Sequence, residues 1–229
     1  MTNIQLAVFD VGGTTMVDNG QVPRAFEEVV HRHGIAMSPA EVAQWRGASK
    51  REAVAYFVQR HYGADDAQNA ARMSQIYGDF KDHLRHTFDI EGVQAIAGAD
   101  ETFAWLHARH VKCALTSGFD RDIVQLILEA LRWDRTVIDA TVSGDEVRKG
   151  RPAPYMIFRA MEQCDVLSVQ AVANIGDTVL DMESGRNASV STNVAVLTGA
   201  HSRDRLVQSP HTHIVNSVAD LPLLLAPFV

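Results

Sequence analysis

Four short, continuous apolar runs, each ending in small or polar residues, constrain the fold more than any other feature of the sequence. They are Leu6-Ala7-Val8-Phe9 and residues 111–115, 171–175 and 194–197. Such runs are typical of strands buried on both faces, which occur in parallel sheets. Helical patterns separate them, at residues 100–109, 121–131 and 153–163. This alternation predicts an α/β fold, with a Rossmann-like parallel sheet covered by helices on both faces.

Residues 16–95 break the alternation, because they show helical patterns and no convincing buried strand. So long a segment is not a loop of a compact domain. We therefore expect an α/β core domain of residues 1–15 and 96–229, and an all-helical cap domain of residues 16–95 inserted after the first strand. The 229 residues suffice for each domain to bury its own apolar centre.

The charge balance restricts the kinds of partner. Lys and Arg number 21 and Asp and Glu 28, so the net charge is −7. This disfavours a nucleic-acid groove or an anionic membrane surface. Met1 to Gln5 contain no Lys or Arg, and the apolar run at residues 221–229 is too short to span a bilayer. Cys113 and Cys164 indicate neither a disulfide framework nor a zinc site. We expect a cytoplasmic enzyme.

Polar residues follow three of the apolar runs. In an open parallel sheet, ligands bind outside the carboxyl ends of the strands, so these residues are the candidates for a functional site. They are Asp10 with Gly12, Gly13, Thr14 and Thr15; Thr116, Ser117 and Gly118; and Asp177 and Asp181.

The first two groups suit an anionic substrate. Asp10 ends its run at a Gly-Gly turn, where free backbone N–H groups can cradle an anion while the carboxylate attacks it. The alternative is an Asp that only caps the turn. Thr116-Ser117-Gly118 would supply a hydroxyl and an N–H group to phosphoryl oxygens, although Ser/Thr-Gly turns are common.

Three carboxylates form a candidate metal site. Asp177 ends the third run and Asp181 lies four residues later, one helical turn on, so both side chains should face the same way. Together with Asp10 they offer hard oxygen ligands for Mg²⁺, which keeps several waters and bridges to a substrate phosphate. For Asp181 alone, a favourable charge at a helix N-terminus is the alternative.

So many carboxylates also need a fixed cation. Arg151 is the candidate, since it lies in Gly150-Arg151-Pro152-Ala153-Pro154 between proline-stiffened residues, and a guanidinium makes bidentate contacts with oxyanions. Lys149, two residues earlier, is the alternative.

In order and spacing, these segments resemble the four motifs of the haloacid dehalogenase-like superfamily over nearly the whole chain. The resemblance implies that Asp10 is a nucleophile and Arg151 the cation of the third motif. It further implies phosphoryl binding by Thr116 and its neighbours. The implied Mg²⁺ ligands are Asp10, Asp177, Asp181 and the carbonyl group of Gly12.

Position 12 departs from the phosphatase pattern. Most phosphatases of this superfamily carry there a second Asp that protonates the leaving oxygen, and Gly12 cannot transfer a proton. Phosphonoacetaldehyde hydrolases lack this acid too, because a cap lysine forms a Schiff base with the substrate aldehyde. Residues 10–15, 116–119 and 150–154 look most like that branch, and residues 197–201 and 211–213 resemble a phosphonatase-like sister group.

Lys50 is the candidate for this lysine. Ser49 and Glu52 match an S-x-x-E capping box, which predicts that Lys50 is the first residue of a helix. A cation there opposes the helix dipole, which favours the neutral, nucleophilic amine. An ordinary solvated lysine is the alternative. The resembled enzymes place a histidine three residues later, where this chain has Ala53, and the histidines that could replace it are His31, His33 and His61.

The leading hypothesis is therefore a Mg²⁺-dependent hydrolase that cleaves the C–P bond of a small phosphonate through an aspartyl-phosphate intermediate. The alternative is a phosphatase that acts on small phosphate monoesters without the second Asp. A non-catalytic phospho-aspartate switch, like a receiver domain, is disfavoured because such domains are shorter and have no inserted cap. We expect a small anionic substrate and neither nucleic acid nor membrane as partner, and leave a homodimer open.

Overall fold

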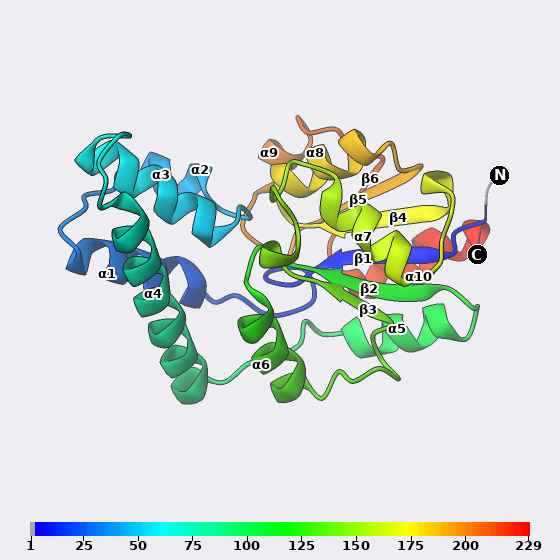
Figure 1. Ribbon diagram of the computed structural model, residues 1–229. Helices are drawn as coiled ribbons and strands as arrows, with labels where there is room; N and C mark the ends of the chain where they lie inside the picture. Colours follow the sequence, from blue (N-terminus) through cyan, green and yellow to red (C-terminus); the bar gives the residue numbers. More distant parts are fainter. Residues whose placement is uncertain (1–2) are drawn as a thin grey trace. The chain divides into compact units, whose positions relative to one another are not determined.

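The computed structural model describes residues 3–229. The chain forms two compact units, one of Met1–Val17 with Val93–Val229 and one of Asp18–Gly92. The first is an α/β unit and the second is helical (Figure 1). Met16 and Ala95 both lie in the α/β unit, where they pair in an isolated β-bridge.

A six-stranded sheet lies at the centre of the α/β unit, in the order β3-β2-β1-β4-β5-β6. Every neighbouring pair is parallel, and this is the Rossmann strand order, so the predicted fold class is confirmed. The strands are β1 (Leu6–Asp10), β2 (Lys112–Thr116), β3 (Ala140–Val142), β4 (Val172–Gly176), β5 (Thr192–Val196) and β6 (His213–Val215). The apolar runs predicted β1, β2, β4 and β5, whereas β3 and β6, three residues each, were missed.

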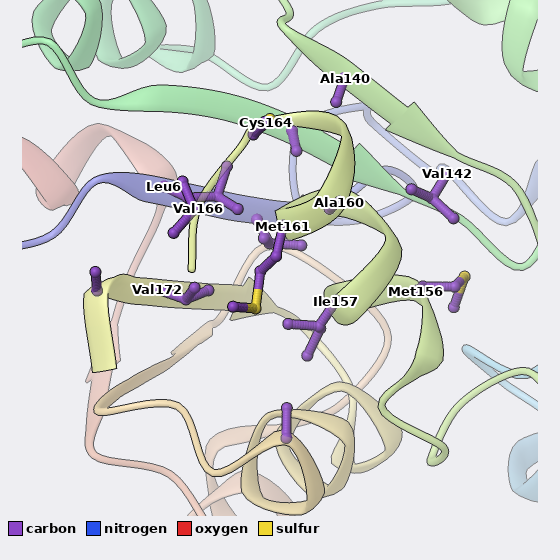
Figure 2. Packing of buried hydrophobic residues seen from close by; sticks show 14 residues of the cluster. Leu6, Ala140, Val142, Met156, Ile157, Ala160, Met161, Cys164, Val166 and Val172 are labelled. Atoms are coloured by element: carbon purple, nitrogen blue, oxygen red, sulfur yellow. The ribbon is translucent and has the colours of Figure 1, made fainter. Parts of the chain in front are cut away.

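Helices cover both faces of this sheet, which explains why its strands read as unbroken apolar runs. The longer helices are α5 (Ala99–His107), α6 (Arg121–Leu131), α7 (Tyr155–Gln163) and α8 (Val179–Ala188); α9 (Arg203–Leu206) and α10 (Leu221–Leu225) are short. On one face, Leu6 and Val8 of β1 pack in a buried cluster with residues of α7 such as Ile157 (Figure 2). On the other, the ring of Phe9 meets that of Phe103 in α5 edge to face, with centroids 5.2 Å apart.

The helical unit consists of α1 (Gln21–Arg32), α2 (Pro39–Gln44), α3 (Lys50–Tyr62) and α4 (Asn69–Glu91). Aromatic rings form part of its core: the Phe26 centroid lies 6.1 Å from that of Phe57 and 5.7 Å from that of Phe80. Helix α3 begins at Lys50, as predicted, and the Ser49 hydroxyl accepts a hydrogen bond from the backbone N–H of Glu52. Within residues 3–229, no helix combines the length and apolar character needed to cross a membrane.

Candidate active site

The sheet topology brings the predicted site residues of the α/β unit to one edge. Asp10 ends β1 and is the register partner of Thr116, which ends β2. Asp177 directly follows β4, the other neighbour of β1. Because these strands are parallel, their carboxyl ends meet where the strand order reverses.

Asp10, Asp177 and Asp181 form a buried carboxylate triad. One oxygen from each side chain lies within 4.8 Å of the others, and the three residues are 7%, 1% and 2% exposed. Burial raises the pKa of Asp10 to about 7 against the lowering effect of Arg151. Burial also raises the pKa of Asp177 well above its usual range, with added repulsion from the other two carboxylates. Buried carboxylates so close together are a donor set that fits a hard divalent cation.

Arg151 is the cation that lies within this triad. Its guanidinium donates from Nη1 to Asp10 Oδ1 over 2.7 Å, and from Nε to Asp181 Oδ1 over 2.8 Å. Nη2 donates to the Thr116 hydroxyl over 2.7 Å. Arg151 is 6% exposed, whereas Lys149 is exposed to solvent. The rigid fork of the Arg151 guanidinium thus bonds to one residue of each of the other three motif segments, Asp10, Thr116 and Asp181.

Asp181 has a second structural task at the start of α8. Thr178 is the N-cap, and its hydroxyl accepts from the Asp181 N–H while Asp181 Oδ2 accepts from the Thr178 N–H over 3.0 Å. Asp177 therefore precedes the helix, and the two carboxylates converge through the turn at Thr178 rather than along a helical face. Asp181 thus caps the helix and also belongs to the triad.

The turn after Asp10 differs from the expected anion cradle at three positions, one of them Thr15, whose N–H donates to Val11 O over 3.0 Å. The N–H of Gly13 donates to Met16 O over 2.7 Å and that of Thr14 to Val11 O over 3.3 Å. The expectation of free N–H groups is therefore wrong for Gly13, Thr14 and Thr15. Gly13 instead provides room: its φ is +82°, and a Cβ there would lie 2.8 Å from Asp177 Oδ2. The Thr14 hydroxyl donates to Asp177 Oδ1 over 3.1 Å, which orients the carboxylate.

The turn after β2 is also bonded internally. The Thr116 hydroxyl donates to Phe9 O over 3.3 Å, and the Ser117 hydroxyl accepts from the N–H of Phe119 over 3.2 Å. The N–H of Ser117 donates to Val142 O. Gly118 lies tightly beside Gly144, where an added Cβ would come 2.9 Å from Gly118 O.

Sequence reasoning gave no role to residues 198–201, which contact this site directly. The Thr198 hydroxyl donates to Gly13 O over 2.7 Å, and the N–H of Ala200 donates to Asp177 Oδ2 over 2.6 Å. His201 Nδ1 accepts from the N–H of Val179 over 3.0 Å. The available signal was position, since this segment follows β5 at the same edge of the sheet.

Lys50 belongs to the helical unit, and the other predicted site residues to the α/β unit. Its Nζ donates to the backbone carbonyl of Trp45 over 3.2 Å and to that of Ala48 over 3.5 Å. Ala53, one turn along α3, is fully buried. Of the candidate histidines, His33 pairs with Asp79 over 2.7 Å, and His31 and His61 are exposed.

Comparison with known proteins decides the family. The sequence profile described as haloacid dehalogenase-like hydrolase matches residues 7–195. The chain belongs to this family. Like its relatives, it is a hydrolase. It is 27% identical to a phosphonoacetaldehyde hydrolase of Bacillus cereus, over 86% of this chain and 77% of that protein. It is 28% identical to one of Latilactobacillus sakei, over 84% and 75%.

Solved structures show the same fold. A phosphonoacetaldehyde hydrolase-like protein of Oleispira antarctica superposes on the hydrolase with a TM-score of 0.83 at 21% identity, covering 99% of this chain and 92% of that one. A hydrolase from Pseudomonas syringae gives a TM-score of 0.82, also at 21% identity, covering 98% and 99%.

Proposed function

We propose that this hydrolase depends on Mg²⁺, uses Asp10 as a covalent nucleophile and cleaves the C–P bond of a small phosphonate that carries a carbonyl group. Two observations together carry the proposal. The buried carboxylate of Asp10 is ion-paired with Arg151, with 2.7 Å between Asp10 Oδ1 and Arg151 Nη1. Position 12, where a phosphatase would carry a proton-donating acid, is a glycine. The similarity to phosphonoacetaldehyde hydrolases supports the same class of substrate.

Asp10, Asp177, Asp181 and the carbonyl group of Gly12 are the residues that would hold Mg²⁺. The ion would supply positive charge against the oxygens of the phosphorus group and so favour attack by an anion. Asp10 and Asp181 are ion-paired with the Arg151 guanidinium, whereas the oxygens of Asp177 accept from two uncharged donors, the Thr14 hydroxyl and the Ala200 N–H. This difference favours Asp177 for direct ligation.

Asp10 would attack phosphorus through a carboxylate oxygen. The new O–P bond forms as the C–P bond breaks, and the electron pair of the C–P bond passes to the leaving carbon. Arg151 lowers the pKa of Asp10 against the effect of burial, so it favours the ionised form that attack requires. Water then hydrolyses the aspartyl phosphate, releases inorganic phosphate and regenerates the carboxylate.

Lys50 would make the leaving carbon stable enough to depart. Its amine would condense with the substrate aldehyde, releasing water and forming an imine that accepts the C–P electron pair as an enamine. Protonation at carbon and hydrolysis then return the free amine and the dephosphonylated aldehyde. No acid is needed at Gly12 on this route. The helical unit of residues 18–92 would act as the cap that carries this lysine.

A phosphatase acting on small phosphate monoesters is the second candidate, and two observations favour it. The amine of Lys50 is bonded to backbone carbonyl groups, and Ala53 is a core residue rather than an assisting histidine. In that case Lys50 would bind an anionic substrate group as a cation.

Phosphate release with Mg²⁺ from a panel of small phosphonates and phosphate monoesters separates these candidates. For the C–P reaction we expect release from a carbonyl-bearing phosphonate, and borohydride added with that substrate should increase the intact mass of the protein. Lys50→Ala should abolish the adduct, whereas Lys81→Ala, which removes another lysine of the helical unit, should keep it. Clear phosphonate turnover without an adduct would refute the imine. Turnover of monoesters alone would establish the phosphatase.

A further inference from the structure

Four consecutive residues after β5, residues 198–201, contact three separate parts of the candidate metal site. Thr198 binds the turn of the nucleophile, Ala200 binds the carboxylate of Asp177 and His201 binds the first turn of α8. These contacts join parts of the chain that are 185, 23 and 22 residues apart in sequence. The segment therefore ties the elements of the site to one another, in addition to ending a strand.

Gly199 makes this approach possible. A Cβ at position 199 would overlap the carboxylate of Asp177, and a Cβ at Gly13 would lie 2.8 Å from the Cα of Gly199. The backbone at Gly199 thus packs directly against the Asp177 side chain, and any larger residue must displace one of the two. Displacement of the carboxylate would change the position of a metal ligand.

Hydrogen bonds define the orientation of the same carboxylate. Asp177 Oδ2 accepts from the N–H of Ala200 over 2.6 Å, and Oδ1 accepts from the Thr14 hydroxyl over 3.1 Å. Each oxygen thus receives one donor and keeps lone pairs for a cation. A carboxylate held in this way loses little conformational freedom when it binds a metal.

His201 extends the support to α8. It is 5% exposed, and its Nδ1 accepts from the N–H of Val179, the first residue of the helix. That N–H has no acceptor within the helix, so the histidine satisfies a terminal donor. Asp181 lies in the same turn, which means that His201 helps to place a second carboxylate of the triad.

We propose that residues 198–201 are positioning residues that hold Asp177 and the start of α8 in the arrangement that binds Mg²⁺. None of them is a metal ligand or touches the substrate in this proposal. It rests on the proposed function, because it assumes that the triad binds Mg²⁺. Its direct consequence is that changes in this segment weaken metal affinity without removing any ligand.

Two pairs of variants test the hydrogen bonds. Thr198→Val removes the hydroxyl at nearly constant volume, and Thr198→Ser restores it. His201→Ala removes the acceptor for Val179, and His201→Asn returns an oxygen to the position of Nδ1. We expect Thr198→Val and His201→Ala to weaken Mg²⁺ binding in calorimetry by about 10–100-fold, the usual effect of losing such support. Thr198→Ser and His201→Asn should recover most of that loss.

Gly199→Ala tests the steric contact, with Gly78→Ala as its matched control. Gly78 lies in α4, where an added Cβ would meet nothing within 4 Å, so its variant should bind Mg²⁺ like the wild type. Gly199→Ala should weaken Mg²⁺ binding by at least about tenfold. The melting temperature of each metal-free variant shows that it is folded. If Gly199→Ala does not fold, the two pairs of variants at Thr198 and His201 still test the proposal.

The outcomes separate this proposal from the proposed function. If wild type and Asp177→Ala bind Mg²⁺ equally or not at all, the metal site itself is refuted. If wild type binds Mg²⁺ and the folded Thr198→Val and His201→Ala variants bind it as tightly, the positioning role is refuted while the metal site stands. Losses that are not recovered by Thr198→Ser and His201→Asn would also overturn the role, since the hydrogen bonds would not be the cause.

Discussion

Asp10→Asn should stabilise the metal-free protein above neutral pH while it abolishes turnover. Asp10 is 7% exposed and shares its surroundings with two further carboxylates and one guanidinium. Burial raises its pKa from 3.8 to about 7. The ionised carboxylate is therefore costly to bury without a bound cation, and a neutral amide avoids that cost. An amide cannot attack phosphorus, so turnover should fall by several orders of magnitude.

The shift in the pKa of Asp10 gives the size of the expected stabilisation. A difference of about 3 pKa units corresponds to about 4 kcal/mol, at ~1.4 kcal/mol per unit. The Asn oxygen can still accept from Arg151, but the new NH₂ group is buried and costs about 1–3 kcal/mol if it lacks an acceptor. We therefore expect a net increase of about 1–3 kcal/mol in the free energy of unfolding. At ~2–4 °C per kcal/mol for a chain of this size, the melting temperature should rise by about 2–12 °C.

The difference in stability between Asp10→Asn and the wild type depends on pH in a defined way. Between the unfolded pKa of 3.8 and the folded pKa of about 7, the folded protein keeps a proton that the unfolded chain has lost. The contribution of Asp10 to stability is thus complete below pH 4 and is lost as the pH rises through 7. Asn has no such dependence, so the advantage of Asp10→Asn should grow from pH 5 to pH 8.

Scanning calorimetry in EDTA at pH 5 and pH 8 measures this difference. Asp65→Asn, which changes an exposed carboxylate, is the control and should leave the melting temperature nearly unchanged at both values. A variant that is less stable than wild type at pH 8, or one whose advantage is the same at both pH values, would refute the reasoning. Retention of more than a tenth of wild-type turnover would refute the nucleophile.

Three further predictions concern the neighbours of Asp10. Asp177→Ala should weaken Mg²⁺ binding in calorimetry by more than Asp181→Ala does, because Asp181 already accepts from Arg151; the reverse order would contradict the ligand assignment. Asp181→Ala should instead lower turnover through a misplaced Arg151, and unchanged turnover would exclude that role. Gly12→Asp should fold, since a Cβ there meets only Met16 Cε at 3.9 Å, and should increase phosphate release from monoesters by supplying the missing acid; a folded variant with no increase would refute this account of position 12.

The local sequence by itself determined the longer strands of the sheet and the positions of Asp10 and Asp177 at their carboxyl ends. Strands β1 and β4 were predicted because a strand that is buried on both faces consists of consecutive apolar residues, and such a run is visible in the sequence. Asp10 and Asp177 then lie at the carboxyl edge, since each directly ends or follows such a strand. The start of α3 at Lys50 was also predicted, because capping depends on neighbours within one turn.

Short elements escaped prediction for a related reason. Strands β3 and β6 have three residues each, too few for a periodic pattern to stand out from its surroundings. Their pairing with β2 and β5 comes from the sheet already present, which supplies the hydrogen-bonding partners that so short a segment cannot specify alone.

The tertiary structure decided which side chains meet. Sequence left Arg151 and Lys149 as alternatives, and only the path of the chain buries the first against Asp10 and exposes the second. It likewise brought Thr198 against Gly13 and Ala200 against Asp177. Such contacts join residues far apart in the chain, so no local pattern encodes them. They exist because parallel strands bring distant segments to one edge, where each buried polar group must find a partner.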